Sequence, residues 1–548
     1  MKQTHPQRGA QSLPAQRAQP AAVAPRGAQP ATGHSPVSRF EPPPPAREVA
    51  PTLRSGIRGP EVQRLQEQLN QYRGRAVPPL APVPTSGAFD GATRAAVCDY
   101  QRLNRLPVTG TASPALQTHL QLRNDSNFRH LGLTTQNEVL GRVMSARTPQ
   151  AREQLVRLAT EPAFSQLNAT HQREMLAAQG ASSSSVAMAT DGLIRLARSS
   201  AFRELNDATR SQVLQTYALH TGSQADVDRC HALVTNPRFV HLTPADQERT
   251  LRVFTAADAQ GRAALTRLVS ERPQVLTQSA LRAGAQATLL DSLERLAQGG
   301  NPHPDALNST LQELADPDRQ INQGPRSSLC TTAALSHTLA TDHPAEYARL
   351  VADLALTGRA QLADGTTVSA PDDGVVRDTS TGRSPSETLL QNALYERGRE
   401  LPNYNARADD PAMFSRRGEE GLFTHQQAQV MRSVLGRPVR ITQPVLAGGM
   451  VDTSGVMRSA ERALASGQRV HANVLVTAQG QRTGHAVEIL RTDREYVYYR
   501  DPMGRDAAQA NAGIHPPSEV SGDASTGIRR MRRGDFEDTV NNILVFDR

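Results

Sequence analysis

The sequence predicts a multidomain chain of class α and α+β. We expect a disordered N-terminal leader, a small three-helix module, an α-helical repeat region and a C-terminal α+β domain. Three observations lead to this expectation. The chain has 548 residues, which corresponds to three or four domains rather than one. A Phe-x-x-Leu motif recurs four times between residues 123 and 305, and strand-like segments gather near the C-terminus.

Composition excludes several classes of protein. The sequence is 38% hydrophobic and has no tryptophan, and no run of about 18 uncharged apolar residues predicts a membrane span. The first residues lack the apolar stretch of a Sec signal peptide. Three cysteines, Cys98, Cys230 and Cys330, are odd in number and far apart, which excludes a disulfide framework and a thiolate-rich zinc site. We expect no metal and no organic cofactor.

The leader is predicted at residues 1–50, which hold ten prolines among Ala, Gln and Arg. Such a segment cannot bury enough apolar surface to offset its ordering entropy. It carries six basic and two acidic side chains, which is half of the net charge of +8. The other half of the net positive charge is distributed over the rest of the chain, where basic and aromatic side chains do not cluster. The charge therefore does not predict a nucleic-acid partner.

The three-helix module is predicted at residues 51–122. Apolar residues fall on one face of each of two helices, and Pro114 to Leu120 gives a third. The pattern resembles bacterial peptidoglycan-binding domains of the three-helix type, whose signature this chain matches at Gly56, Gly59, Val62, Leu65, Gln66, Leu69, Gly87, Phe89, Thr93, Ala96, Val97, Gln101 and Gly110. Tyr100 replaces the usual Phe, Asp90 the usual Gly and Ser86 the usual Asp. The resemblance implies peptidoglycan as a partner.

Residues 123–305 are predicted to form α-helical repeats of about 37 residues. Phe128, Phe164, Phe202 and Phe239 each begin a Phe-x-x-Leu motif, and a leucine lies twelve residues after each Phe. Asn168, Asn206 and Thr243 stand where they can cap the helix that follows. We expect two helices per repeat, stacked so that the repeats bury one another's faces. The repeats could serve as a spacer or as a partner-binding surface, and both functions fit this pattern. We expect Cys230 in the core of the repeat region.

The candidate nucleophile is Cys330, at the start of the domain expected at residues 315–548. Ser327 and Ser328 are placed to cap a helix from about Leu329 to Leu339, so Cys330 lies in its first turn. There the helix dipole and unpaired backbone N–H groups lower the pKa of a thiol. Four strands are expected after it, at residues 470–478, 485–490, 495–501 and 541–547.

The candidate base is His485 and its orienting group is Asp501. If the hairpin that joins their strands turns at Asp493, His485 lies directly opposite Asp501. A thiolate nucleophile needs such a base, and the base needs a group that orients it. His337 lies two turns from Cys330, too far to be the base, and His471 is expected to be structural.

The order Cys, His, Asp and the long separation of Cys330 from His485 resemble papain-like cysteine peptidases. The motifs Gly484-His485-Ala486-Val487 and Tyr499-Arg500-Asp501-Pro502-Met503-Gly504 are similar to those of calpain-type members. The resemblance implies a papain-like α+β domain and a Gln that helps to bind the oxyanion. That Gln usually stands six residues before the Cys, where this chain has Gly324. Gln323, one residue earlier, is the oxyanion candidate.

The sequence thus predicts a cell-wall-targeted bacterial thiol hydrolase that cleaves an amide bond in a protein or a peptidoglycan stem peptide. Two alternatives stay open: a non-catalytic peptidoglycan-binding scaffold, and an interbacterial effector or toxin delivered into a target cell by a non-Sec route. The expected location is accordingly the cell wall, the extracellular space or a target cell.

Overall fold

The structure is a computed structural model, and it describes residues 51–181, 185–282, 287–298, 300–324, 327–377, 382–399, 421–444, 451–478, 481–503, 520–523 and 526–548. The chain divides into two units, Met1–Ala50 and Pro51–Arg548. The leader expected at residues 1–50 lies outside the described residues.

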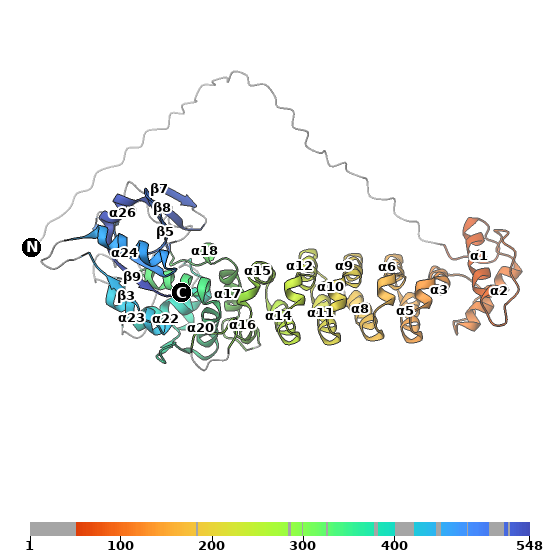
Figure 1. Ribbon diagram of the computed structural model, residues 1–548. Coiled ribbons are helices and arrows are strands. Elements are labelled where there is room, and N and C mark those ends of the chain that lie inside the picture. Colours follow the sequence, from red (N-terminus) through yellow and green to blue (C-terminus); the bar gives the residue numbers. More distant parts are fainter. Residues whose placement is uncertain are drawn as a thin grey trace, which may run out of the picture. The chain divides into compact units, whose positions relative to one another are not determined.

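The N-terminal module consists of three helices around a small core (Figure 1): α1 (Pro60–Gly74), α2 (Gly91–Leu103) and α3 (Pro114–Asn124). The apolar faces predicted for the first two helices are buried. Asp90 and Ser113 cap α2 and α3, because each side chain accepts a backbone N–H of the helix that follows. Asp90, which replaces the glycine of the signature, therefore has a local structural role.

Four helical repeats follow the module, and each consists of a short helix and two longer ones. The first two repeats are α4 (Ser126–Arg129), α5 (Leu133–Ser145) and α6 (Pro149–Ala159), then α7 (Pro162–Ser165), α8 (Ala169–Ala181) and α9 (Val186–Arg198). The next two are α10 (Ser200–Glu204), α11 (Asp207–His220) and α12 (Gln224–Val234), then α13 (Pro237–Val240), α14 (Pro244–Ala256) and α15 (Ala259–Glu271).

The expectation of two helices per repeat missed the short helix, which carries the Phe of each motif. All four of these Phe side chains are fully buried. The predicted caps are confirmed, because Asn168, Asn206 and Thr243 accept a backbone N–H of the next helix. Gln172 also donates its side-chain N–H to the carbonyl of Leu167 at 2.8 Å and so ties a long helix to the motif before it.

The repeats stack in two layers, which Figure 1 shows as two rows of helices. One layer runs through α5, α8, α11 and α14, and the other through α6, α9, α12 and α15. Both layers continue past the fourth repeat, because α16 (Leu289–Ala297) packs on α14 and α17 (Asp305–Ala315) packs on α15. A helical turn, η1 (Pro273–Val275), lies between α15 and α16.

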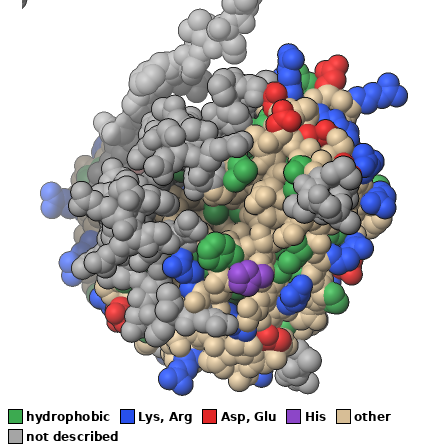
Figure 2. All heavy atoms as spheres, turned by 90° about the vertical axis from the view of Figure 1, so that its left-hand side faces the viewer, with side chains coloured by type: hydrophobic (Ala, Val, Ile, Leu, Met, Phe, Trp, Pro, Cys, Tyr) green, Lys and Arg blue, Asp and Glu red, His purple; other side chains and the backbone are tan. Residues whose placement is uncertain are grey.

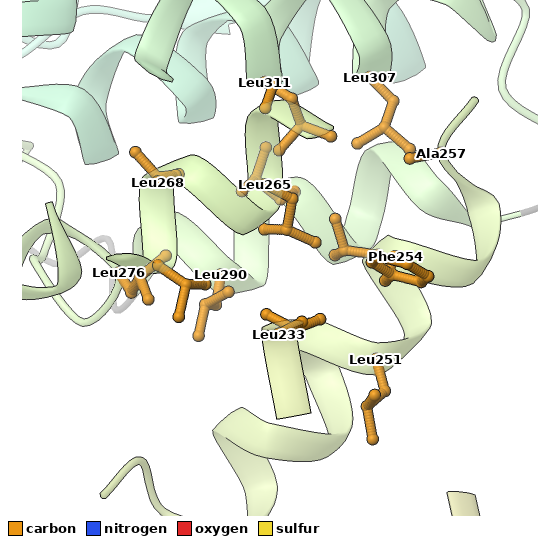
Figure 3. Close-up of a cluster of buried hydrophobic side chains, with 14 of the residues drawn as sticks. Leu233, Leu251, Phe254, Ala257, Leu265, Leu268, Leu276, Leu290, Leu307 and Leu311 are labelled. Atoms are coloured by element: carbon orange, nitrogen blue, oxygen red, sulfur yellow. The ribbon is translucent and has the colours of Figure 1, made fainter. Parts of the chain in front are cut away.

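The hydrophobic core has no break between the repeats and the C-terminal part of the chain. Figure 3 shows leucines of α12, α14 and α15 in one cluster with Leu290 of α16 and with Leu307 and Leu311 of α17. In turn, α16 packs on α20 (Pro344–Thr357), and α17 packs on α20 and α22 (Pro385–Arg399). The residues around the expected boundary, 305 to 315, thus form a helix that both parts share.

The C-terminal part contains a seven-stranded antiparallel sheet of order β3-β9-β4-β5-β6-β8-β7. Its strands are β3 (Arg440–Thr442), β4 (Arg469–Ala478), β5 (Gln481–Thr492), β6 (Tyr496–Arg500), β7 (Val520–Asp523), β8 (Ile528–Arg532) and β9 (Val540–Phe546). The four strands expected from the sequence correspond to β4, β5, β6 and β9. A separate hairpin pairs β1 (Arg359–Gln361) with β2 (Thr367–Ser369). The other helices of the described residues are α18 (Pro317–Gln320), α19 (Cys330–Asp342), α21 (Asp373–Val376), α23 (Thr424–Leu435), α24 (Thr453–Ala465) and α26 (Arg533–Thr539).

Strand β5 packs against helices on both faces of the sheet. Its residues Val487 and Ile489 join a core cluster with Val456 of α24 and Phe536 of α26. Glu488, between them, points the other way and bonds to α19. The sheet thus holds α19, which begins with Cys330, on the face opposite α24 and α26.

In the described part of the chain, no helix is long and apolar enough to cross a membrane. On the face shown in Figure 2, basic side chains lie mostly along the margin, with acidic ones among them, and a few lie nearer the middle beside a histidine.

Candidate active site

Cys330 is the first residue of α19, so the prediction that it lies in the first turn of a helix is confirmed. The predicted cap is wrong, because Leu329 occupies the N-cap position and no side chain caps the helix. Ser327 instead accepts the N–H of Leu329 at 3.4 Å and lies two residues before the N-cap position. The backbone N–H of Thr331, in the first turn of α19, favours the thiolate of Cys330, which is 8% exposed.

His485 lies on β5, and Asp501 directly follows β6. The Nε2 atom of His485 lies 2.9 Å from Oδ1 of Asp501. Both side chains are buried, Asp501 completely. Because Nε2 is engaged by the carboxylate, Nδ1 is the ring nitrogen left for the thiol of Cys330.

The predicted hairpin register is wrong by two residues, yet the two side chains meet. The structure pairs Glu488 with Arg500, and a bulge follows Ile489. Continued by one residue, this register sets Asp501 opposite Val487 rather than His485. An offset of two keeps both side chains on one face of the sheet, where diagonal neighbours are within reach, whereas an offset of one would have separated them.

The electrostatics of the site favour a thiolate and an imidazolium. Burial raises the pKa of the Cys330 thiol, but the hydrogen bond and charge of His485, with backbone N–H groups of Ala486 and Thr331, bring it below its usual value. Burial lowers the pKa of His485, but the charge of Asp501, its hydrogen bond and the bond to Cys330 raise it to about 10. The electrostatics thus couple Cys330 to His485, and a hydrogen bond of 2.9 Å joins His485 to Asp501.

Backbone and side-chain groups fix the carboxylate of Asp501. Its Oδ1 also accepts the N–H of Met503 at 2.9 Å, and its own N–H donates to the carbonyl of Gly527 at 2.9 Å. Arg529 of β8 places Nε 3.8 Å from Oδ2. The motif residue Gly504 lies outside the described residues.

Gln323, the oxyanion candidate, lies in the segment between α18 and α19 and is 5% exposed. Its N–H donates to the carbonyl of Pro502 at 2.8 Å, which brings it beside the residue that follows Asp501. Its side-chain Nε2 donates to the carbonyl of Ser327 at 3.0 Å. Gly324, at the position where the family has its Gln, has φ of +80°, a backbone conformation that favours glycine.

The other histidines and cysteines that the sequence singled out lie apart from Cys330, His485 and Asp501. His337 bridges two carboxylates, Glu488 at 2.7 Å and Asp318 at 2.9 Å. His471 bonds to Thr338 at 2.9 Å, and burial lowers its pKa to about 4. Cys230 is fully buried, as expected, and burial raises the pKa of its thiol to about 12. Cys98 is half-buried in the N-terminal module.

A buried ionic network behind the site was not foreseen. Arg469 of β4 holds Asp342 of α19 through two bonds of 2.6 Å and also contacts Glu488 at 2.5 Å. Burial alone would raise the pKa of Glu488, but the charges of His337 and Arg469 lower it by more. The pKa of Glu488 therefore lies below its usual value, and the side chain stays ionised. The network fixes α19 on the sheet. The signal in the sequence was a glutamate among apolar residues in the strand HAVEIL.

Among the described residues, no group of three or more His, Cys, Asp or Glu side chains is arranged to hold a metal ion.

The signature residues of the N-terminal module build its frame. Gln66 donates to Thr93 at 2.8 Å and accepts the N–H of Gly87 at 3.0 Å, which ties α1 to the loop before α2. Gln101 accepts the N–H groups of Thr109 and Gly110 and ties α2 to the loop before α3. Gly56, Gly59, Gly87 and Gly110 all have positive φ. Tyr100, the departure from Phe, bonds through its hydroxyl to His119 at 2.6 Å.

Residues 58–120 match the family model "Putative peptidoglycan binding domain". This match confirms the prediction for the module and supports peptidoglycan as a partner and association with bacterial cell walls. The peptidoglycan-binding domain covers the three helices α1 to α3 almost completely. No curated protein matches the chain. The papain-like resemblance of residues 315–548 stays a prediction.

Proposed function

We propose that the chain is a bacterial thiol hydrolase that its peptidoglycan-binding domain holds at the cell wall. Its substrate is an amide bond in a protein or in a peptidoglycan stem peptide. The observation that carries the proposal is the placement of Cys330 at a helix N-terminus and its electrostatic coupling to His485, which bonds to Asp501. The pKa of the thiol is lowered and that of the imidazole is raised. Perturbed pKa values of this kind gather at functional sites.

In the proposed reaction, His485 holds the proton of Cys330, and the thiolate attacks the amide carbonyl. The tetrahedral oxyanion is stabilised by the backbone N–H of Cys330 and by the amide of Gln323. His485 then gives its proton to the leaving amine as the C–N bond breaks, which leaves a thioester on Cys330. Water, deprotonated by His485, hydrolyses the thioester and restores the thiol. Asp501 orients the ring through Nε2 and stabilises its charge.

A papain-like fold for the C-terminal part belongs to the same proposal. It is supported by the order of the three residues in the chain and by a nucleophile at a helix N-terminus. It is supported also by the origin of His485 and Asp501, which lie on neighbouring antiparallel strands.

The test of the hydrolase is digestion of purified peptidoglycan and of casein side by side. We expect the full chain to release new amino termini from one of the two. Cys330→Ala should abolish the release, and His485→Ala should lower the rate by about 10² to 10⁴-fold because it removes the general base and acid. Cys230→Ala is the matched control, since that thiol is buried away from the site. If neither substrate is cleaved, the non-catalytic scaffold becomes the better account.

Attachment to the wall is tested by sedimentation with insoluble peptidoglycan. We expect the full chain to sediment and a variant without residues 51–122 to stay in solution, because the match to the binding domain lies within that segment. The isolated module should sediment alone. Equal sedimentation of the truncated chain would show that another part binds the wall.

A further inference from the structure

The segment Ile321–Gly324 is attached to the strand end that carries Asp501. Arg500, the last residue of β6, donates its guanidinium N–H to the carbonyl of Ile321. Pro502 accepts the N–H of Gln323 at 2.8 Å. Both contacts come from residues next to Asp501, so the oxyanion candidate and the orienting carboxylate share one frame.

The same segment is held from the other side by α22. Glu387 accepts the N–H of Asn322 on Oε1, and Gln391, one turn further, donates Nε2 to the carbonyl of Asn322 at 2.9 Å. The side chain of Asn322 in turn accepts the N–H of Gly324 at 2.8 Å. Glu387 and Gln391 are both almost fully buried. The backbone N–H and C=O of Asn322 therefore both form hydrogen bonds with buried side chains of α22.

Burial of the Glu387 side chain costs desolvation free energy. Its second oxygen, Oε2, accepts the N–H of Ser384 at 2.6 Å, so the carboxylate holds two backbone donors at once. Another carboxylate, Glu313 of α17, is buried in the same region and disfavours its charge. An apolar side chain would avoid the desolvation of both groups but would leave the N–H of Asn322 without its acceptor.

We propose that Glu387 and Gln391 are positioning residues that hold Gln323, in the segment before Cys330, through Asn322. The inference rests on the proposed function, in which Gln323 stabilises the oxyanion. An oxyanion donor lowers the barrier only if it is already placed where the charge develops. The clamp from α22 supplies that placement without touching the substrate.

Glu313 offers a matched control for Glu387. It is equally buried and also carboxylate, but its oxygens accept from Tyr347, Ser384 and Ser386 and none of them contacts residues 321–324. Changing Glu313 to Gln therefore removes a similar buried carboxyl group from the same region and leaves the bonds to Asn322 in place.

Hydrogen exchange of the full chain tests the clamp directly. In Glu387→Gln we expect the amides of Asn322 and Gln323 to exchange at least tenfold faster, because an amide side chain cannot accept two N–H groups on two oxygens. Glu313→Gln should leave them within twofold of the wild type. Gln391→Met is a second variant of similar size that removes only the donor, and it should also raise the exchange. Unchanged exchange in Glu387→Gln and Gln391→Met overturns the proposal.

Kinetics show whether the placement serves catalysis. Glu387→Gln should lower kcat about tenfold or more with KM unchanged. This loss is smaller than the loss of about 10² to 10³-fold in kcat that follows removal of an oxyanion donor. In a double-mutant cycle, Glu387→Gln should add little to the loss already caused by Gln323→Ala. Additive losses, or an equal loss in Glu313→Gln, would show a merely structural role. If the wild type cleaves nothing, the proposed hydrolase fails, while the exchange data still decide the clamp.

Discussion

The contrast between Cys330 and Cys230 shows how position decides the chemistry of a thiol. Both side chains are buried, and burial alone raises the pKa of Cys230 to about 12. Cys330 has the same penalty but begins a helix and bonds to His485, and its pKa falls below the usual value. The sequence could predict this difference, because a helix N-terminus and the interior of an amphipathic repeat have different patterns.

Glu313 gives a residue-scale prediction for the pH dependence of stability. Burial raises its pKa from 4.5 to about 7, so the folded protein keeps a proton that the unfolded chain releases. The contribution of this group is therefore most favourable below about pH 4.5 and declines as pH rises toward 7. Relative to Glu313→Gln, we expect the wild type to lose on the order of 2 kcal/mol of unfolding free energy between pH 5 and 8.

Chemical denaturation of both proteins at several pH values measures this difference. Burial and the charge of Glu313 raise the pKa of Glu387 to about 8, so replacing Glu313 also changes the titration of Glu387, and the comparison reports the two carboxyl groups together. A wild type that gains stability over the variant as pH rises would show that Glu313 is ionised in the folded state.

At the scale of elements, the sequence predicted which helices and strands are present better than it predicted their register and their ends. The strands around His485 and Asp501 could be predicted because β-branched and aromatic residues mark them. Their register could not, because the turn centres between Arg494 and Glu495 rather than at Asp493, and the bulge after Ile489 then reduces the offset from three residues to two. His485 and Asp501 still meet because an offset of two residues leaves both side chains on the same face of the sheet. Likewise, Ser327 has the right residue type for a cap, but it lies two residues before the N-cap position, where its carbonyl accepts the side-chain N–H of Gln323.

The repeats show a similar limit. The four Phe-x-x-Leu motifs predicted an array, and the caps Asn168 and Asn206 predicted where its long helices begin. The short helix at each Phe was missed, since four or five residues are too few to show a helical period. Helices α16 and α17 continue both layers without the motif, so a search for the repeat ends before the array does.

At the scale of the whole molecule, the array and the site are parts of one packed body. Leu307 and Leu311 of α17 lie in the core shared with the repeats, and Glu313 of the same helix bonds to α20 and α22. The helix α22 in turn holds Asn322. A cut at residue 315 therefore removes a helix on which the segment before Cys330 indirectly depends.

Truncation tests this continuity. A chain of residues 315–548 should lack a cooperative thermal transition, because the faces of α20 and α22 that pack on α16 and α17 become exposed. A chain of residues 288–548, which begins at the cap Thr288 of α16, should unfold cooperatively. Cooperative unfolding of the shorter chain at a similar temperature would show that the domain is independent of the array.

The most direct test of the central claim, that Cys330 and His485 form an ion pair, is the pH profile of alkylation by iodoacetamide, followed by mass spectrometry. Only a thiolate is alkylated. An ordinary thiol with a pKa of about 8.5 slows about 100-fold between pH 8 and pH 6. We predict that Cys330 changes less than about twofold over this range in the wild type and regains the steep profile in His485→Ala. A steep profile at Cys330 in the wild-type protein would contradict the account.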